Sequence, residues 1–117
     1  MGTLFHEGSG ETGIHPRVAP LPGEPVVLKR RTSAFAGTDF DLVLRALGVE
    51  SIVLTGVATG AMVAATLFDA SDRDFGLTVL SDACADGERD VHDFLMERIF
   101  PARGAEVLTG QAWMDRL

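Results

Sequence analysis

The chain has little of what three classes of protein require. Its single cysteine, Cys84, cannot form an internal disulfide, so the sequence is not that of a disulfide-stabilised secreted domain. Its longest apolar stretch, Ala61 to Phe68, is far shorter than the ~20 residues that span a bilayer. Met1 to Gly13 lacks the apolar run of a signal peptide. We therefore expect a cytoplasmic protein that does not enter the membrane.

Positive charge is also scarce. The 117 residues include 10 Lys and Arg against 17 Asp and Glu, which gives a formal net charge of −7. Nucleic acids and anionic membranes need clustered basic residues, so neither is expected as a partner. The one basic cluster, Lys29-Arg30-Arg31, suits a small anionic or carbonyl ligand, or solubility alone.

Three histidines are present, but they form no metal-ligand pattern, and we expect no metal and no cofactor. His15 lies in a loop rich in Gly and Pro, together with His6 further upstream. His92 opens a predicted helix and is expected to face solvent or to cap that helix.

The pattern divides the chain into an extended arm, residues 1–25, and an α/β domain, residues 26–117. Strands are predicted at 26–28, 51–55, 77–80 and 105–108. Helices are predicted at 40–47, capped by Thr38 and ended by Gly48, at 59–72, and from 91 to Pro101, with a closing helical turn or two within 111–117. This alternation predicts parallel strands joined by right-handed crossovers in a layered domain. Sites in such sheets lie beyond the carboxyl ends of the strands, here at Lys29, 56–62 and 81–86.

The segment Gly56 to Met62 is typical of a strand-to-helix elbow that presents a nucleophile. Met62 stands where a thiol is expected, and a thioether has no proton to lose and cannot attack as a thiolate. We interpret Met62 as a core residue, or alternatively as part of a pocket that still binds a ligand. The Thr59 hydroxyl would need an adjacent base to attack, so hydrogen bonding within the turn is its expected role.

Several ordered blocks resemble the isochorismatase-like cysteine hydrolases. They are Lys29 to Thr38, Leu44 to Gly48, Leu54 to Thr59, Asp69-Ala70 and Ser81 to Ala83. The resemblance runs from about Gly8 to Trp113. It implies a three-layer Rossmann-like fold with a mainly parallel sheet, and hydrolysis of small amides, ureides or isochorismate by an Asp, a Lys and a Cys.

Carried over residue by residue, the resemblance assigns the family lysine to Lys29 and the cysteine position to Met62. It implies a cis peptide between Val57 and Ala58, with Thr59 in the oxyanion elbow. Phe35 belongs to the loop that shapes the pocket, where it is expected to pack. No acidic residue before Lys29 follows an apolar strand, so the first two strands of the family fold are expected to be missing.

These departures predict a hydrolase-family protein that lacks thiol-dependent hydrolysis. The alternatives are a non-catalytic binding or oligomer-assembly module, and a fragment of a longer hydrolase. The expected partners are a small carbonyl ligand and further copies of the chain. Cys84 follows a strand with no adjacent base and is expected to be structural.

Overall fold

A parallel three-stranded sheet flanked by helices organises the computed structural model, which describes residues 16–117. The strands are β1 (Ser51–Val57), β2 (Gly76–Ala85) and β3 (Glu106–Leu108), in that spatial order. The helical elements are η1 (Pro16–Val18), α1 (Phe40–Ala46), η2 (Thr59–Val63), α2 (Ala64–Asp72), α3 (Arg89–Phe94), η3 (Leu95–Ile99), α4 (Phe100–Ala102) and α5 (Gly110–Met114). The predicted parallel α/β domain is confirmed.

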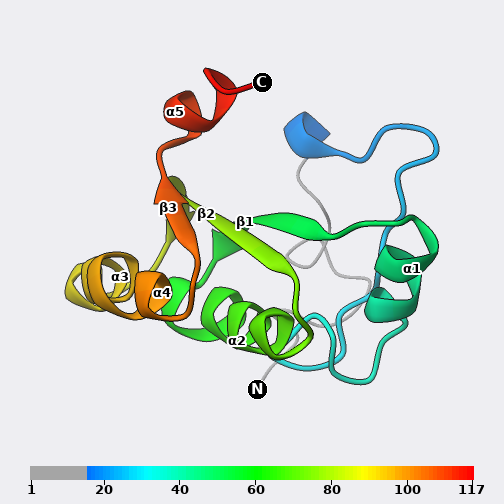
Figure 1. The fold of residues 1–117 in the computed structure, drawn as a ribbon, viewed down its shortest axis with the longest axis horizontal. Helices are drawn as coiled ribbons and strands as arrows, with labels where there is room; N and C mark the ends of the chain where they lie inside the picture. Colours follow the sequence, from blue (N-terminus) through cyan, green and yellow to red (C-terminus); the bar gives the residue numbers. More distant parts are fainter. Residues whose placement is uncertain (1–15) are drawn as a thin grey trace.

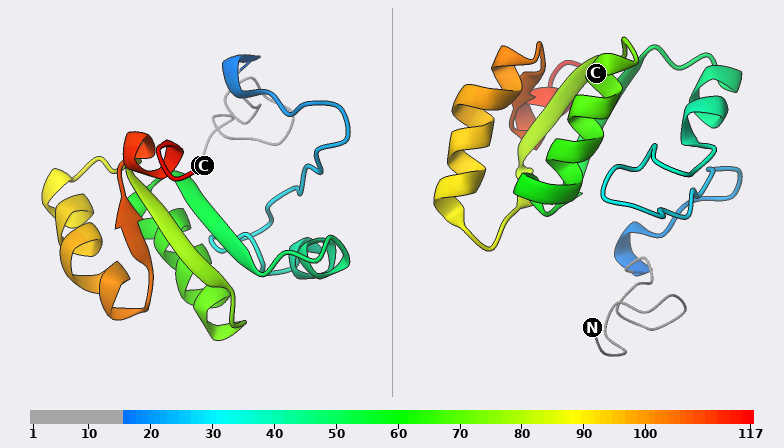
Figure 2. Two further views of the ribbon diagram at one scale, coloured as in Figure 1. Left: turned by 45° about the horizontal axis from the view of Figure 1, so that its top comes forward. Right: turned by 90° about the horizontal axis from the view of Figure 1, so that it is seen from below.

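The two crossovers lie on the same side of the sheet. η2 continues directly into α2, and α3 continues through η3 into α4. Figure 1 shows α2, α3 and α4 on one side of the strands and α5 on the other. Figure 2 shows the same arrangement from two further directions. Right-handed crossovers between strands added in one direction place their helices on a common face, as seen here.

The core lies between the sheet and these crossover helices. Leu67 of α2, Val79 of β2 and Phe100 of α4 have no exposed surface. Each such side chain contributes roughly 1.5–3 kcal/mol of hydrophobic stabilisation on burial. Along β1 the burial alternates, so that Ile52 and Leu54 pack against this core while Val53 and Val57 do not.

β2 is longer than the sequence predicts, because it runs on through Ser81 to Ala85. Its pairing with β1 is regular as far as Leu54 and Val79, then shifts so that Gly56 pairs with Cys84. β2 pairs with β3 only from Thr78 to Leu80. Beyond Leu80 the two strands separate, and this separation creates space beneath α3.

The helix boundaries follow local sequence signals closely. Gly48 has φ +72° and donates its N–H to the Arg45 carbonyl, so its predicted place after the helix end is confirmed. The N-cap of α1 is Asp39, one residue after the predicted Thr38, but Asp39 makes no side-chain capping hydrogen bond. The Thr38 hydroxyl accepts from the N–H of Phe40, the first residue of α1, at 3.2 Å and donates to the Ala34 carbonyl at 2.6 Å.

Two predicted elements differ from the structure. Residues 26–28 form no strand; Val26 and Leu28 are 62% and 51% exposed, because no strand of the described residues lies beside them to complete a ladder. The third predicted helix begins at Arg89 and ends at Ala102, one residue beyond Pro101. It passes Pro101 because the N–H groups of Arg103 and Ala105 still reach the carbonyls of Ile99 and Phe100.

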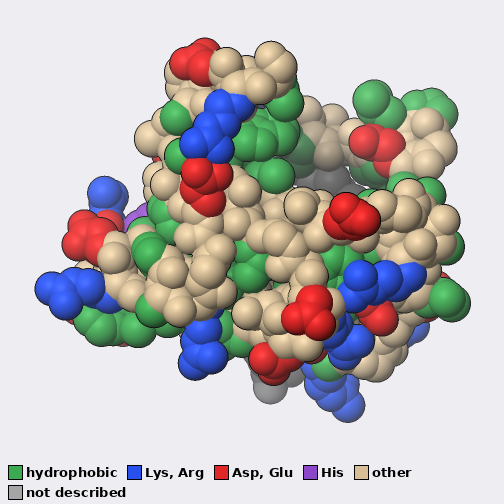
Figure 3. All heavy atoms as spheres, viewed as in Figure 1, with side chains coloured by type: hydrophobic (Ala, Val, Ile, Leu, Met, Phe, Trp, Pro, Cys, Tyr) green, Lys and Arg blue, Asp and Glu red, His purple; other side chains and the backbone are tan. Residues whose placement is uncertain are grey.

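One side of the sheet remains open. β1 is an edge strand among the described residues, and Val53 and Val57 are 40% and 69% exposed. Hydrophobic side chains gather between α5 and the sheet in Figure 3, which views the same face as Figure 1. Parallel sheets normally have both faces covered, whereas the face that carries Val53 and Val57 is partly open among the described residues. The unpaired edge of β1 fits a sheet from which strands are missing. None of the helices described for residues 16–117 combines the length and apolar character needed to cross a membrane.

Candidate functional site

The elbow lies at the carboxyl end of β1, where the chain turns into η2. The peptide bond between Val57 and Ala58 is cis, as the resemblance implies. The Ala58 carbonyl accepts hydrogen bonds from the N–H groups of Ala61 at 3.0 Å and Val63 at 3.1 Å. These bonds begin the helix immediately after the strand, so the elbow is a tight turn at the expected place.

Thr59 is held by a residue far away in the sequence. It is fully buried, and its Oγ1 lies 2.7 Å from Nδ1 of His92 in α3. His92 is itself only 8% exposed, so the expectation that it faces solvent or caps the helix is wrong. The two residues are 33 positions apart, so the expectation that Thr59 bonds within its own turn is wrong, and no local pattern in the sequence indicates the pairing.

Gly60 is fixed from the same side by the loop after β2. Its N–H donates to Asp86 Oδ2 at 2.7 Å, and Asp86 Oδ1 accepts from the Glu88 N–H at 3.0 Å. These backbone donors, that of Glu88 first, lower the pKa of Asp86 below its ordinary value. Asp82 likewise accepts from the Gly110 N–H at 2.7 Å. Both carboxylates therefore satisfy backbone donors, Asp86 at the elbow and before α3, and Asp82 at the start of α5.

Met62 does not lie in the core. Its side chain is 40% exposed, whereas Thr59 and Val63 on the same helical turn are buried. The turn that directs Thr59 and Val63 inward therefore directs Met62 outward, and the interpretation of Met62 as a core residue is wrong. Met62 therefore presents an accessible thioether at the elbow.

Lys29 and the elbow are not connected by any hydrogen bond or ion pair in the described structure. Lys29 is exposed, and its Nζ donates to the Arg31 carbonyl at 2.7 Å. The loop that follows is fastened to α2, because Ser33 Oγ donates to Asp69 at 2.9 Å and the Ala34 N–H donates to Thr66 Oγ1 at 3.0 Å. Lys29 thus lies just before an anchored loop.

Phe35 belongs to the core beneath that loop. It is 4% exposed, and its ring centroid lies 4.8 Å from that of Phe40 and 5.9 Å from that of Phe75. Phe35 therefore packs in the core, as the sequence led us to expect.

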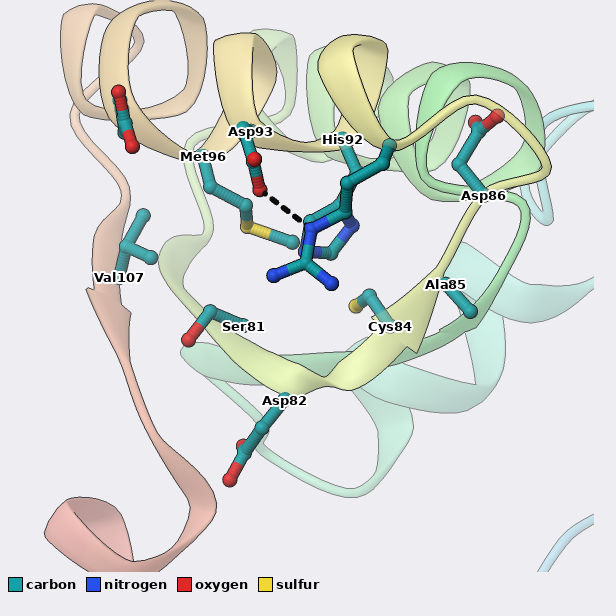
Figure 4. A pocket seen from close by; sticks show the side chains of 11 residues that line it. Ser81, Asp82, Cys84, Ala85, Asp86, His92, Asp93, Met96 and Val107 are labelled. Atoms are coloured by element: carbon teal, nitrogen blue, oxygen red, sulfur yellow. Dashed lines mark hydrogen bonds and ion pairs between the residues drawn. The ribbon is translucent and has the colours of Figure 1, made fainter.

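A cavity of about 630 Å³ lies where β2 separates from β3 beneath α3. Figure 4 shows Cys84 pointing into it from β2 and Met96 and His92 entering from the helix above. Its lining comprises Ser81, Asp82, Cys84, Ala85, Asp86, Arg89, His92, Asp93, Met96, Glu97 and Val107. Sequence analysis missed this cavity, because it depends on where β2 leaves β3.

Cys84 has the surroundings of a structural thiol. Burial, and secondarily the negative charge of Asp82, raise its pKa above the ordinary value, although a hydrogen bond from the Gly56 backbone opposes them. Its Sγ lies 4.0 Å from the Leu54 carbonyl oxygen. A nucleophilic thiol requires a lowered pKa, so Cys84 has the opposite character.

Within residues 16–117, no three His, Cys, Asp or Glu side chains are grouped so as to hold a metal ion. His6 and His15 lie outside the described residues.

Comparison with known proteins gives consistent matches. Residues 1–112 match the family model described as the isochorismatase domain. The ureidoacrylate amidohydrolase RutB of Stutzerimonas stutzeri is 38% identical over 82 residues, which are 70% of this chain and 33% of that protein. The uncharacterised isochorismatase family protein YwoC of Bacillus subtilis is 35% identical over 102 residues, which are 83% of this chain and 54% of YwoC.

A solved structure has the same fold. The isochorismatase-like hydrolase of Alkaliphilus metalliredigens superposes with a TM-score of 0.86 at 31% identity. The match covers 93% of this chain and 59% of that one. The chain thus spans only about a third to just over half of the two curated relatives it matches.

Proposed function

The chain belongs to the isochorismatase family, and from this premise we propose that it is a hydrolase-family protein without thiol-dependent hydrolysis. Family members resembling it act on small amides, ureides or isochorismate. The proposal assigns this chain the family's fold and elbow, and at most the binding of a small carbonyl compound.

The observation that supports the proposal most directly is the presence of Met62 at the elbow. It occupies the position of the family cysteine, one helical turn after the cis peptide, and its side chain is 40% exposed. A thioether cannot be deprotonated, so no environment converts it into the thiolate that attacks a carbonyl. The elbow can still present backbone N–H groups, but these stabilise an oxyanion only after a nucleophile has attacked.

The remaining groups offer no substitute within the described residues. Glu24 is the one carboxylate between residue 16 and Lys29, and it is exposed and accepts the Leu21 N–H at 2.6 Å. Lys29 bonds to a carbonyl of its own loop. Thr59 is fully buried against His92, so its hydroxyl is not accessible to a substrate.

The test is a hydrolysis assay on the purified full chain with nicotinamide, ureidoacrylate and isochorismate. We expect no turnover above the uncatalysed rate. Lys29→Ala is the diagnostic variant, and Arg98→Ala, which removes an exposed cation on η3, is its matched control. Turnover that Lys29→Ala abolishes and Arg98→Ala leaves unchanged would defeat the proposal.

A second candidate function, assembly with further copies of the chain, is favoured by the open side of the sheet. The unpaired edge of β1 and the exposed Val53 and Val57 are features that promote strand pairing between chains. Sedimentation velocity over a range of concentrations distinguishes the cases. A concentration-dependent dimer supports assembly, and a monomer at all concentrations counts against it.

A further inference from the structure

The cavity beneath α3 is separate from the elbow chemistry. Neither Met62 nor Lys29 lines it, and its floor is the part of β2 that has left β3. A volume of about 630 Å³ lies within the range of roughly 300–1,000 Å³ that small-molecule sites occupy. The cavity is therefore large enough for a compact organic ligand.

The deep part of the cavity is apolar and is lined by two sulfur-containing side chains. Cys84 and Met96 are 9% and 6% exposed, and Val107 of β3 forms a side wall. Figure 4 shows the Cys84 thiol and the Met96 thioether on opposite sides of the space. The raised pKa of Cys84 keeps this thiol uncharged near neutral pH. A ligand that fills this part must present an apolar body.

Unused donors lie at the same cavity. Arg89 donates its Nε–H to Asp93 at 3.1 Å, while its two Nη groups have no partner among the described residues. The Arg89 side chain is 87% exposed, and its ion pair with Asp93 uses one edge of the guanidinium and leaves the other edge for a planar acceptor. His92, which is over nine-tenths buried, has its Nδ1 at Thr59, so its Nε2 is without a partner among the described residues.

Most carboxylates that line the cavity already have hydrogen-bond or ion-pair partners. Asp86 receives two backbone N–H groups, and Asp93 is paired with Arg89. Asp82 receives the Gly110 N–H, and Figure 4 shows its side chain directed away from the cavity. Only Glu97 lacks a described partner, and it is exposed at the rim.

From these contacts we propose that the cavity binds a small monocarboxylate with an apolar body. The carboxylate accepts from the free edge of Arg89 and from the Nε2–H of His92, in the tautomer in which the Thr59 hydroxyl donates to Nδ1. The body lies against Cys84, Met96 and Val107. Arginine suits this role because its planar fork matches a carboxylate in a bidentate geometry. The carboxylates of the lining repel such a ligand and limit its affinity, and Glu97, which has no described partner, provides the test of this repulsion.

Three probes of the same shape and different charge examine the proposal: benzoate, benzyl alcohol and benzylammonium. Each is titrated into the full chain, and binding is followed by the NMR signals of the Met96 methyl and the His92 ring. We expect saturable shifts with benzoate and weaker ones with benzyl alcohol. Benzylammonium binding as tightly as benzoate, or a failure of benzoate to saturate, would overturn the proposal.

Variants then separate the cavity from general charge effects. Arg89→Ala is expected to weaken benzoate about fivefold, the upper end for an exposed ion pair, while Arg98→Ala leaves affinity unchanged. Glu97→Gln is expected to strengthen binding about two- to fivefold, whereas Glu50→Gln, at an exposed carboxylate outside the lining, has no effect. Equal effects of Arg89→Ala and Arg98→Ala, or weaker binding by Glu97→Gln, would refute the assignment.

Discussion

Replacing Gly60 with alanine tests whether the elbow and α3 are as closely packed as the structure indicates. A Cβ at Gly60 would lie 2.9 Å from Val91 Cγ1 and 3.0 Å from Asp86 Oδ2. Carbon atoms in contact normally lie about 3.5–4.0 Å apart, so one of these neighbours has to move. Val91 is on α3 and Asp86 holds the Gly60 N–H, so the movement separates the elbow from its supports.

The expected loss of stability follows from two opposing effects. Inserting a methyl group into a closely packed contact typically costs about 1–3 kcal/mol. Alanine recovers up to ~1 kcal/mol, because glycine loses more backbone entropy in a helix. We therefore expect Gly60→Ala to lower the free energy of unfolding by about 1–2 kcal/mol. For a domain of this size that corresponds to a fall in melting temperature of roughly 4–8 °C.

Gly87→Ala is the matched control. Gly87 lies in the loop between Asp86 and α3, and a Cβ there meets no atom within 4 Å. Thermal unfolding of the two variants and the wild type is followed by circular dichroism at one protein concentration. We expect Gly87→Ala to melt within about 2 °C of the wild type, since surface substitutions change stability by about 0.5 kcal/mol or less.

The double variant Gly60→Ala/Val91→Ala sharpens the interpretation. Removing the Val91 methyl groups relieves one of the two close contacts, so the combined loss should be smaller than the sum of the single losses by ~1 kcal/mol. The reasoning about close packing at the elbow is wrong if Gly60→Ala and Gly87→Ala have the same melting temperature. It is also wrong if the stability losses of Gly60→Ala and Val91→Ala simply add in the double variant.

Two further outcomes are expected at the same contact region. Asp86→Asn should melt at a lower temperature than the wild type at neutral pH, and this difference in melting temperature should disappear as the pH falls through the pKa of Asp86. Folding lowers that pKa, so the ionised carboxylate contributes stability above the unfolded-state pKa, about 3.9, and the contribution is lost in acid. A gap that persists in acid, or an equal gap for Asp72→Asn, would contradict this account. Thr59→Val should cost about 1–3 kcal/mol in urea unfolding, since it leaves the buried Nδ1 of His92 without a partner. Thr59→Ser keeps the hydroxyl, and a Val variant as stable as the Ser variant would remove that explanation.

The features that sequence predicted well depend on local signals. Gly48 ends α1 because a residue with positive φ is needed there, and glycine adopts it without a Cβ clash. The parallel order of β1, β2 and β3 follows from apolar strands that alternate with helices. The elbow is expected after the strand that ends near Thr55, and the helix does begin there, at Thr59.

The features that sequence missed depend on distant partners. A run such as Val26 to Leu28 has strand character, but a strand exists only beside another strand. Met62 lies in an apolar stretch, yet the π-helical turn at the start of the helix decides which of its residues face the core. His92 has no local partner, and its burial follows from the approach of α3 to Thr59. Each outcome is set by tertiary packing.

The anchoring of Ser33 and Ala34 to α2 sets the reach of Lys29. Ser33 is four positions after Lys29, and an extended chain covers at most ~3.5 Å per residue, so Lys29 lies within ~14 Å of a fixed point. Residues 28–32 are exposed, so no buried side chain fixes Lys29 within that radius. The one hydrogen bond described for its ammonium group goes to the Arg31 carbonyl of the same loop, so the anchored loop limits the reach of Lys29 without setting its direction.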